Sequence, residues 1–283
     1  MFSIIIPTFN NLEYLKLCLH SIKKNSIIEH QIILHINEGS DGSLDYAKEN
    51  NIEYTHSNEN IGLCSAVNLA AKNAKTDYII YCHDDMYFCP EWDLILQNEI
   101  EKTNTNLYYF SGTMIEPKNG HINFDCGDCV ENFNEHKLLN NYKKLKYFDY
   151  QGSTWAPHLI HKEIWNKIGG LSEEFNPGIG SDPDLNMKLW NEGVRIFKGL
   201  SNLKVYHFGS ISLRKKKNLK KNNGSRQFLK KWGISINFFK KYYLNANTKY
   251  INRLPNPKKN FSFYKDLIIC KMYRLYLIIF FKI

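Results

Sequence analysis

The segment Asp77–Met86, DYIIYCHDDM, decides the fold prediction because a short apolar run ends there in two adjacent carboxylates. The run from Tyr78 to Tyr81 is typical of a buried strand, which places Asp84 and Asp85 at its carboxyl end. Ligands bind at this edge in open α/β sheets. Two neighbouring carboxylates repel each other unless a cation or a proton lies between them. The segment therefore predicts a divalent cation holding a diphosphate, and a solvated turn is the alternative.

Apolar runs alternate with helical patterns around this segment, which predicts parallel βαβ units with right-handed crossovers. The first strand is followed by Pro7-Thr8-Phe9-Asn10-Asn11 rather than GxGxxG, which argues against a dinucleotide-binding Rossmann domain. No GxxxxGK[ST] occurs, which excludes a P-loop. Strands are expected at 2–6, 31–36, 52–55 and 77–82, and helices at 11–24, 44–50 and from residue 60 through 74.

The pattern beyond residue 110 is less regular. Residues 111–150 are rich in Asn, Lys and Tyr and predict loops and short strands. Regular structure is expected again in three places: a helix within 155–170 that carries Ile160, Ile164 and Ile168 on one face, a helix that opens at Asp182-Pro183-Asp184, and a strand that ends at 205–207.

Charge divides the chain into two parts. Residues 213–283 contain 19 Lys/Arg and one acidic residue, a net charge of +18. Residues 1–212 contain 18 Lys/Arg and 27 acidic residues, a net charge of −9. We expect an acidic domain at 1–212 and a basic, mainly helical extension at 213–283, facing different partners.

Cysteine use and the start of the chain predict a cytoplasmic protein. The seven cysteines are odd in number and scattered, mostly in apolar segments, and no signal peptide precedes the first strand. Cys126 and Cys129 form one CxxC flanked by His121 and His136. A zinc site is one interpretation, but the spacing is irregular and no second CxxC exists, so we interpret the cysteines as reduced structural thiols.

Six motifs in order resemble those of the family 2 glycosyltransferases, the inverting enzymes with the GT-A fold. They are SIIIPTFN (3–10), NEGSDGS (37–43), ENIGLCSAVNLA (59–70), HDDM (83–86), IGGLSEEF with GIGSDPDLNMKLW (168–175 and 178–190), and VYHFGS (205–210). The resemblance covers residues 2 to 212. It implies a Rossmann-like α/β domain with a mostly parallel central sheet and flanking helices. It also implies transfer of a sugar from a nucleoside diphosphate donor, expected to be a UDP-sugar.

The resemblance implies roles for the acidic motifs. Glycosyl transfer must stabilise a departing diphosphate and deprotonate an acceptor hydroxyl. Asp85 and His207 are implied to hold Mn²⁺ or Mg²⁺, and Asp182 to be the general base. His83 stands where many relatives carry an acid, and Ser181 where the family has a glutamate, which makes the metal requirement less certain and alters the surroundings of the base. A buried strand-end histidine and a simple helix cap are the alternatives for His207 and Asp182.

The first loops are implied to bind the donor. Trp155 and Asp184 are expected on the sugar or acceptor side, with core packing and helix capping as the alternatives. The residues expected to bind the nucleotide-sugar are Pro7, Thr8, Phe9, Asn37, Glu38, Asn60, Gly62 and Asp84.

Aromatic residues alternate with cations in the extension, which fits an anionic membrane surface. Residues 267–283 are apolar but too short and too charged to span a bilayer, so a monotopic anchor or a helix packed on the catalytic domain is expected. Nucleic-acid binding is the rival interpretation, and the acidic domain carries no motif that supports it. The cation-rich segments are Arg214–Lys221, Phe228–Trp232 and Phe238–Tyr243.

A membrane-facing enzyme suits a glycan or lipid-linked glycan acceptor. We therefore expect a role in capsule, lipopolysaccharide or related glycoconjugate synthesis, at the inner face of the cell membrane. The alternative from another class is a non-catalytic GT-A-like protein that binds glycans or partners. The presence of both Asp85 and Asp182 argues against it, because a binding module needs neither a metal ligand nor a base.

Overall fold

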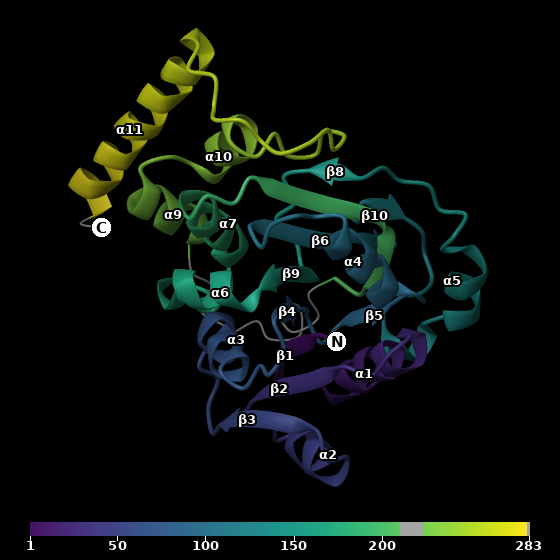
Figure 1. The fold of residues 1–283 in the computed structure, drawn as a ribbon. Helices are drawn as coiled ribbons and strands as arrows, with labels where there is room; N and C mark the ends of the chain where they lie inside the picture. Colours follow the sequence, from purple (N-terminus) through teal and green to yellow (C-terminus); the bar gives the residue numbers. More distant parts are fainter. Residues whose placement is uncertain (210–222, 282–283) are drawn as a thin grey trace.

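The structure is a computed structural model that describes residues 1–209 and 223–281. One mixed β-sheet runs through its centre with helices on either side (Figure 1). The strands of the described residues are β1 (Ser3–Phe9), β2 (Gln31–Asn37), β3 (Glu53–Ser57), β4 (Tyr78–Tyr81), β5 (Met86–Phe88), β6 (Tyr108–Glu116), β7 (Ile122–Asn123), β8 (Tyr150–Gln151), β9 (His158–His161) and β10 (Ile196–His207). The α-helices are α1 (Leu12–Asn25), α2 (Ser43–Glu49), α3 (Leu63–Ala71), α4 (Trp92–Glu101), α5 (Glu135–Asn141), α6 (Lys162–Ile168), α7 (Ser181–Asn191), α9 (Gly224–Trp232), α10 (Ile236–Tyr242) and α11 (Phe261–Phe281).

The first half of the sheet is parallel, in the order β3-β2-β1-β4. The apolar run of β1 is fully buried, as expected for a central strand covered on both faces. β1 pairs with β2 up to Phe9 and Asn37, and with β4 up to Ile5 and Tyr81. The carboxyl ends of these strands therefore meet at one edge, where α/β sheets bind ligands.

The second half of the sheet is mixed. β9 lies antiparallel between β4 and β6, and β6 runs parallel to β10. β5 is antiparallel to β10, with Met86 opposite His207. This pairing returns the acidic segment after β4 to the carboxyl end of β10. The predicted α/β fold with a mostly parallel central sheet is confirmed.

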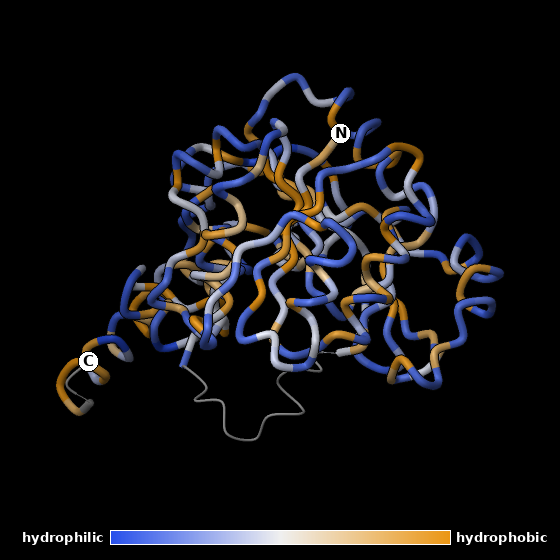
Figure 2. The backbone as a smooth tube through the Cα atoms, turned by 90° about the horizontal axis from the view of Figure 1, so that it is seen from below, coloured by the Kyte–Doolittle hydropathy of each residue, from blue (hydrophilic) through white to orange (hydrophobic). Residues whose placement is uncertain are grey.

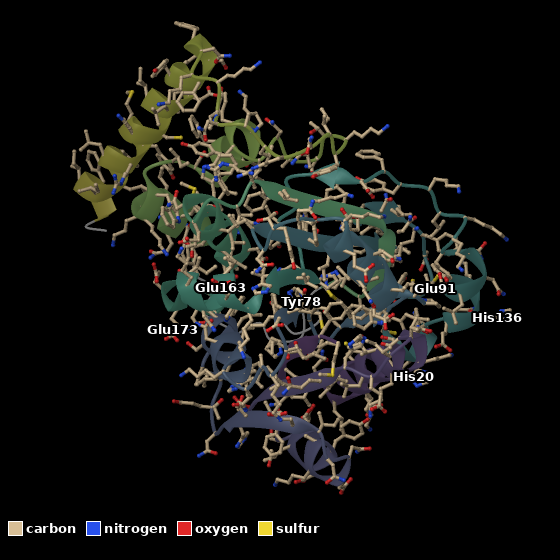
Figure 3. The ribbon with its side chains drawn as sticks, viewed as in Figure 1. His20, Tyr78, Glu91, His136, Glu163 and Glu173 are labelled. Atoms are coloured by element: carbon tan, nitrogen blue, oxygen red, sulfur yellow. The ribbon has the colours of Figure 1, made fainter. Side chains whose placement is uncertain are left out.

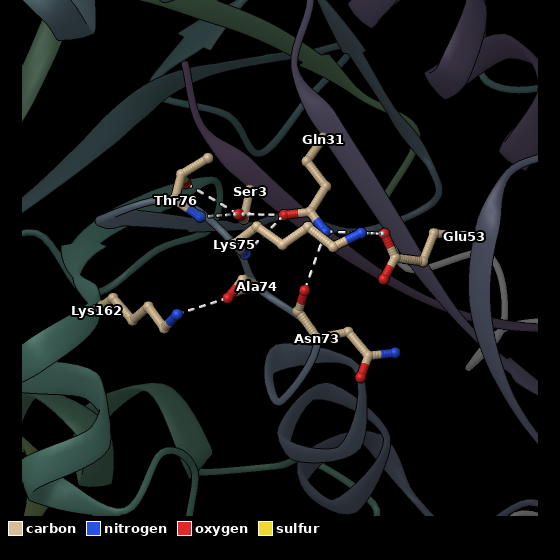
Figure 4. Close-up of polar contacts among 8 residues, drawn as sticks. All are labelled: Ser3, Gln31, Glu53, Asn73, Ala74, Lys75, Thr76 and Lys162. Atoms are coloured by element: carbon tan, nitrogen blue, oxygen red, sulfur yellow. Dashed lines mark hydrogen bonds and ion pairs between the residues drawn. The ribbon is translucent and has the colours of Figure 1, made fainter.

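A network of hydrogen bonds joins the strands at the opposite, amino-terminal edge of the sheet (Figure 4). The side-chain oxygen of Gln31 accepts hydrogen bonds from the hydroxyl of Ser3 (2.6 Å) and the amide of Lys75 (2.8 Å). Its amide nitrogen donates to the carboxylate of Glu53 (2.8 Å) and the carbonyl of Asn73 (3.0 Å). One side chain thus joins the starts of β1, β2 and β3 to the turn before β4.

Two details of the sequence interpretation were wrong. Ile160 does not share a helical face with Ile164 and Ile168, because it lies in β9 and pairs with Ile79 of β4. A buried strand and the first turn of a helix carry the same apolar spacing when one follows the other directly, so periodicity could not separate them. Residues 111–150 also contain more than loops and short strands, since they include most of the nine-residue strand β6 and the helix α5.

The extension packs against the central sheet and its helices. Side chains of α9 and α10 are buried in the same hydrophobic cluster as the sheet, among them Phe228, Leu229, Phe238 and Phe239. The expected boundary near residue 212 and the basic run Arg214–Lys221 lie outside the described residues, so the domain division stays a prediction. In the part of the chain that is described, every helix is too short or too polar to cross a membrane.

Candidate active site

The carboxyl edge of β1, β2 and β4 opens into a cleft that α7 closes from the other side. Its lining combines the loops after three strands with the first turn of a helix, which is the arrangement predicted from the sequence. The lining residues are Pro7, Thr8, Phe9, Asn37, Asn60, Leu63, Tyr81, His83, Asp84, Asp85, Pro177, Gly178, Ile179, Ser181 and Asp182.

The two aspartates after β4 have different surroundings. The hydroxyl of Thr8, at the end of β1, donates a 2.7 Å hydrogen bond to the carboxylate of Asp84. Burial and the neighbouring charge of Asp85 raise the pKa of Asp84 to about 7, against the effect of this hydrogen bond. Asp85 instead faces the end of β10, where the amide of Phe208 donates to its carbonyl oxygen (3.2 Å).

Three side chains form a candidate metal centre at this point. One ligand atom from each of His83, Asp85 and His207 lies within 4.8 Å of the others. Nε2 of His207 lies 3.4 Å from Oδ1 of Asp85, and Nδ1 of His83 lies 3.9 Å from the same oxygen. On its other side, Nδ1 of His207 hydrogen-bonds a carboxylate oxygen of Glu116 (2.6 Å), at the end of β6. This carboxylate fixes the orientation of the imidazole, as second-sphere carboxylates do in metal sites.

The protonation of the cluster suits a divalent ion. Desolvation lowers the pKa of His83 to about 4, so this imidazole offers a lone pair at neutral pH. Burial also acts to lower the pKa of His207, but Asp85 and Glu116 outweigh it and raise the value to about 10. His207 therefore carries a proton that an incoming cation would displace. Its Nε2 faces Oδ1 of Asp85 (3.4 Å), so this nitrogen can ligate an ion shared with Asp85 once the proton has left. The residues fit a metal ion.

Asp182 lies across the cleft in the first turn of α7. Its Oδ1 is buried and makes no hydrogen bond to any described residue. Burial raises the pKa of Asp182 to about 7, and the positive charge of Lys240 opposes this rise. A carboxylate that titrates near neutral pH is matched to the task of a general base. The role of Asp182 as the general base, which the resemblance implied, stays a prediction.

Lys240 reaches this site from α10, in the extension. Its Nζ lies 5.6 Å from the centre of the Trp155 ring, within the range of a cation–π contact. Trp155 is 44% exposed, so its ring is accessible to a ligand and is not part of the hydrophobic core. The alternative of core packing for Trp155 is thereby set aside. The basic extension therefore contributes a cation to the side of the cleft where Asp182 lies.

A profile described as "Glycosyl transferase family 2" matches residues 3–164 of the chain, which is more than half of it. The chain belongs to this family. The predicted family and enzyme class are confirmed. A comparison with curated proteins finds no match in sequence.

Solved structures share the fold of this family 2 chain at low identity. The structure of S. aureus TarS 1-349 aligns over 99% of this chain and 72% of its own, with 14% identity and a TM-score of 0.57. TarS 1-349 in complex with UDP aligns over 72% of this chain and 59% of its own, with 15% identity and a TM-score of 0.54. GalNAc-T7 with UDP, GalNAc and Mn²⁺ aligns over 73% of this chain and 43% of its own, with 18% identity and a TM-score of 0.55. The chain therefore spans less than two thirds of two of these three relatives.

Asp184 has partners that the sequence did not reveal. It is fully buried in α7, and its Oδ1 accepts a hydrogen bond from the indole of Trp232 (2.7 Å) and contacts the ammonium of Lys231 (2.9 Å). Both partners belong to α9 of the extension. In this family 2 chain Asp184 joins the extension to α7, and it does not line the cleft. Its expected role in acceptor binding stays a prediction.

Two backbone amides at the start of α3 already donate hydrogen bonds to other residues of the protein. The amide of Cys64 donates to the side-chain oxygen of Asn176 (2.9 Å), and the amide of Leu63 to the carbonyl of Pro177 (3.3 Å). Gly62 is required here, because a Cβ at this position would lie 2.4 Å from the same Asn176 oxygen and its φ is +84°. These two amides are therefore already bonded in the described structure, and the predicted contact of Gly62 with a diphosphate stays untested.

The remaining predicted donor residues divide into two groups. Asn37 and Asn60 line the cleft, and the side-chain oxygen of Asn37 accepts the amide of Ile61 (3.0 Å), which holds the loop in place. Glu38 lies outside the cleft lining, where its carboxylate accepts a hydrogen bond from Asn10 (2.9 Å). The predicted contact between Glu38 and a pyrimidine stays untested.

The CxxC segment does not assemble a metal centre among the described residues. His136 lies on α5, at the edge of the molecule (Figure 3). Cys126 is buried and its amide bonds the hydroxyl of Tyr206 (2.9 Å). Cys126 and Cys129 do not come together with His121 and His136 in a group able to hold an ion. Within the described ranges, the ligand cluster that does form is the one around Asp85.

Sequence reasoning missed Glu116 and Lys240, and gave His83 no ligand role. The sequence offered a signal only for His83, through its place next to Asp84 and Asp85. Glu116 meets His207 across 91 residues of sequence, and no local pattern marks it.

Proposed function

We propose that this protein transfers a sugar from a nucleoside diphosphate donor, expected to be a UDP-sugar, to an acceptor hydroxyl with inversion. The observation that carries the proposal is that His83, Asp85 and Asp182 line one cleft. This arrangement supports a metal centre for the leaving diphosphate and a base for the acceptor within the same cleft. A binding module has no need of either group, which disfavours the non-catalytic alternative.

The proposed reaction is a single displacement. The acceptor oxygen attacks the anomeric carbon while Asp182 takes the proton from the acceptor hydroxyl. The bond between the anomeric carbon and the diphosphate oxygen breaks, and its electron pair leaves with the diphosphate. Attack from the face opposite the leaving group inverts the anomeric configuration. A base with a pKa near 7 is ionised in a large fraction of molecules at neutral pH, so it accepts the proton without an external base.

His83, Asp85 and His207 would hold Mn²⁺ or Mg²⁺. Bound there, the ion would act as a Lewis acid that neutralises charge on the leaving diphosphate. Two imidazole nitrogens with one carboxylate favour Mn²⁺, because Mg²⁺ prefers an all-oxygen shell. The crystal structure of GalNAc-T7 with UDP and Mn²⁺ supports this choice by analogy of fold.

The loops after β1 and β2 are proposed to bind the nucleotide. Phe9 offers an aromatic ring to a base, while Thr8 supports Asp84 and Asn37 holds the neighbouring loop. UDP or UDP-GlcNAc is present in structures of TarS 1-349, which supports UDP as the nucleotide.

We place the acceptor on the side of Trp155 and Lys240, in the class of glycans or lipid-linked glycans. Aromatic faces pack on sugar rings, and Lys240 adds a cation to that side. We further propose a cytoplasmic enzyme on the inner face of the membrane that acts in surface polysaccharide or glycoconjugate synthesis. This part rests on the cation-rich extension and not on the cleft.

Thermal unfolding with UDP, GDP, CMP and dTDP, each with Mn²⁺ and with EDTA, tests the donor site. A ligand at about 100 times its Kd stabilises a protein by about 2.7 kcal/mol, which is measurable as a shifted midpoint. We expect a shift that needs both UDP and Mn²⁺. A shift indifferent to EDTA would indicate a metal-independent transferase. No shift with any nucleotide would favour the non-catalytic alternative.

A further inference from the structure

Helix α11 touches the rest of the protein along a narrow line. In the described structure, the side chains of α11 that are buried are Phe263, Cys270 and Leu277. They are spaced by seven residues, which is close to two helical turns, so they lie on one side of the helix. Figure 1 shows α11 standing at the periphery of the molecule, away from the central sheet. Most of the helix surface therefore faces outward.

The outward surface of α11 is apolar. Figure 2 shows hydrophobic residues along the helix close to the C-terminus. The exposed fractions of the residues of this outward face run from 46% for Tyr276 to 85% for Phe261. Single exposed apolar residues are ordinary, whereas a contiguous apolar patch marks an interaction site. The outward face consists of Phe261, Tyr264, Ile268, Ile269, Met272, Leu275, Tyr276, Ile279 and Phe280.

The charge around this face indicates which kind of partner it can bind. Residues 223–281 contain 12 Lys/Arg and one acidic residue, Asp266, which is paired with Lys241 (2.8 Å). A second copy of the chain would bring the same excess of positive charge against it, which disfavours self-association through this face. An anionic lipid surface matches both properties, because it offers negative headgroups and an apolar layer beneath them.

The length and composition of α11 define how it would bind. Its 21 residues carry Lys265, Lys271 and Arg274, and no described helix meets the requirements of a membrane span. Lys265 and Lys271 are exposed among the outward apolar residues. Their long side chains can reach the headgroups while the neighbouring apolar side chains enter the layer beneath.

We propose that the outward face of α11 inserts into the anionic leaflet of a membrane, parallel to its surface. The protein would then be held by a surface helix rather than by a spanning segment. This inference deepens the proposed location at the inner face of the membrane. It does not depend on sugar transfer, since the contact surface and the cleft are formed by different residues.

Co-sedimentation of the full chain with phosphatidylcholine vesicles, with and without phosphatidylglycerol, tests the proposal. We expect binding to the anionic vesicles, weakened by salt because the cations contribute. The variant Ile268→Ser/Met272→Ser/Ile279→Ser removes three outward apolar side chains. It is expected to bind these vesicles at least about tenfold more weakly, since three apolar side chains would no longer be buried in the membrane.

The matched control is Ile27→Ser/Ile28→Ser, which changes two exposed isoleucines after α1. It should bind the vesicles like the unmodified chain. Circular dichroism and the nucleotide-dependent thermal shift verify that both variants are folded, which separates lost folding from lost membrane contact.

Three results would overturn the proposal. One is that the unmodified chain ignores anionic vesicles. Another is that the triple variant binds them as well as the control does. The third is that sedimentation velocity without lipid shows a dimer that the triple variant converts to monomer, because the face would then belong to a second copy.

Discussion

The two edges of the central sheet use the same strands in opposite ways. At the amino edge, Gln31 uses both its oxygen and its nitrogen in hydrogen bonds to four different residues. At the carboxyl edge, Asp84 is buried and Asp182 is half-buried, and the pKa of each is raised to about 7. A satisfied polar group stabilises the fold, whereas a buried group without full compensation costs stability and stays reactive. The contrast fits a fold in which one edge stabilises the strand order and the other carries the proposed chemistry.

The largest expected effect comes from Asp182→Asn at the carboxyl edge. The amide cannot accept the proton of the acceptor, so we expect transfer to fall by about 10²–10⁴-fold, the range typical of general-base catalysis. Folding should be retained, because Asn has the same shape and removes a charge whose burial is unfavourable. Transfer kinetics and a thermal scan measure the two quantities.

Nucleotide binding is the control for this variant. Asp182→Asn should keep the UDP-dependent and Mn²⁺-dependent thermal shift, because the carboxylate lies apart from the metal cluster. If transfer persists within about tenfold of the unmodified rate, another residue is the base.

The second effect concerns the metal. Glu116→Gln removes the carboxylate that orients His207, and such changes lower metal affinity by about 10–100-fold. Titration calorimetry with Mn²⁺ measures it. Glu163→Gln, on the exposed surface of α6 (Figure 3), is the matched control and should leave the affinity unchanged. Equal affinities for the two variants would remove Glu116 from the site.

The third effect tests the amino edge. Gln31→Ala leaves several polar groups without their partner, and we expect a loss of about 1–3 kcal/mol in the free energy of unfolding. Mn²⁺ affinity should not change. Gln97→Ala, on the exposed surface of α4, should cost less than about 0.5 kcal/mol. A change in Mn²⁺ affinity for Gln31→Ala would show that the two edges are coupled.

The smallest effect is on pH dependence. Transfer requires ionised Asp182, so its rate should rise as pH rises through about 7. Lys240 lowers the pKa of Asp182, so Lys240→Ala should move the acidic limb of the rate profile to higher pH. The loss is then greatest below pH 7 and fades in alkaline buffer. Lys241→Ala, which removes a neighbouring lysine paired with Asp266, should not move the limb.

The sequence pointed to the candidate site residues at the carboxyl edge, but not to Glu116 and Lys240, which contact or face them. Asp85, His207 and Asp182 were assigned from motifs. The strand ends before Asp85 and at His207 followed from apolar runs, and the helix that begins near Asp182 followed from Asp182-Pro183-Asp184. Glu116 and Lys240 were missed because they reach the site through the order of strands in the sheet and through the docking of the extension. Such contacts depend on the whole fold. No local pattern marks Glu116, and the cation-rich segment that contains Lys240 was interpreted as facing a membrane rather than the cleft. Ile160 shows the limit within one element, since apolar spacing alone could not tell a strand from the helix after it.

The contact of Asp184 with Trp232 and Lys231 limits how the chain can be truncated or recombined with another. Composition separates an acidic part from a basic part, but this contact makes them interdependent. Asp184 is fully buried, and leaving a buried acceptor without its partners costs about 1–3 kcal/mol, a sizeable share of the about 5–15 kcal/mol that holds a protein folded. A chain that ends before α9 would lack both partners of Asp184, and this carboxylate lies two residues from Asp182, the proposed base. The tail is therefore not an exchangeable module, and recombination or truncation has to treat α7 and α9 as one unit.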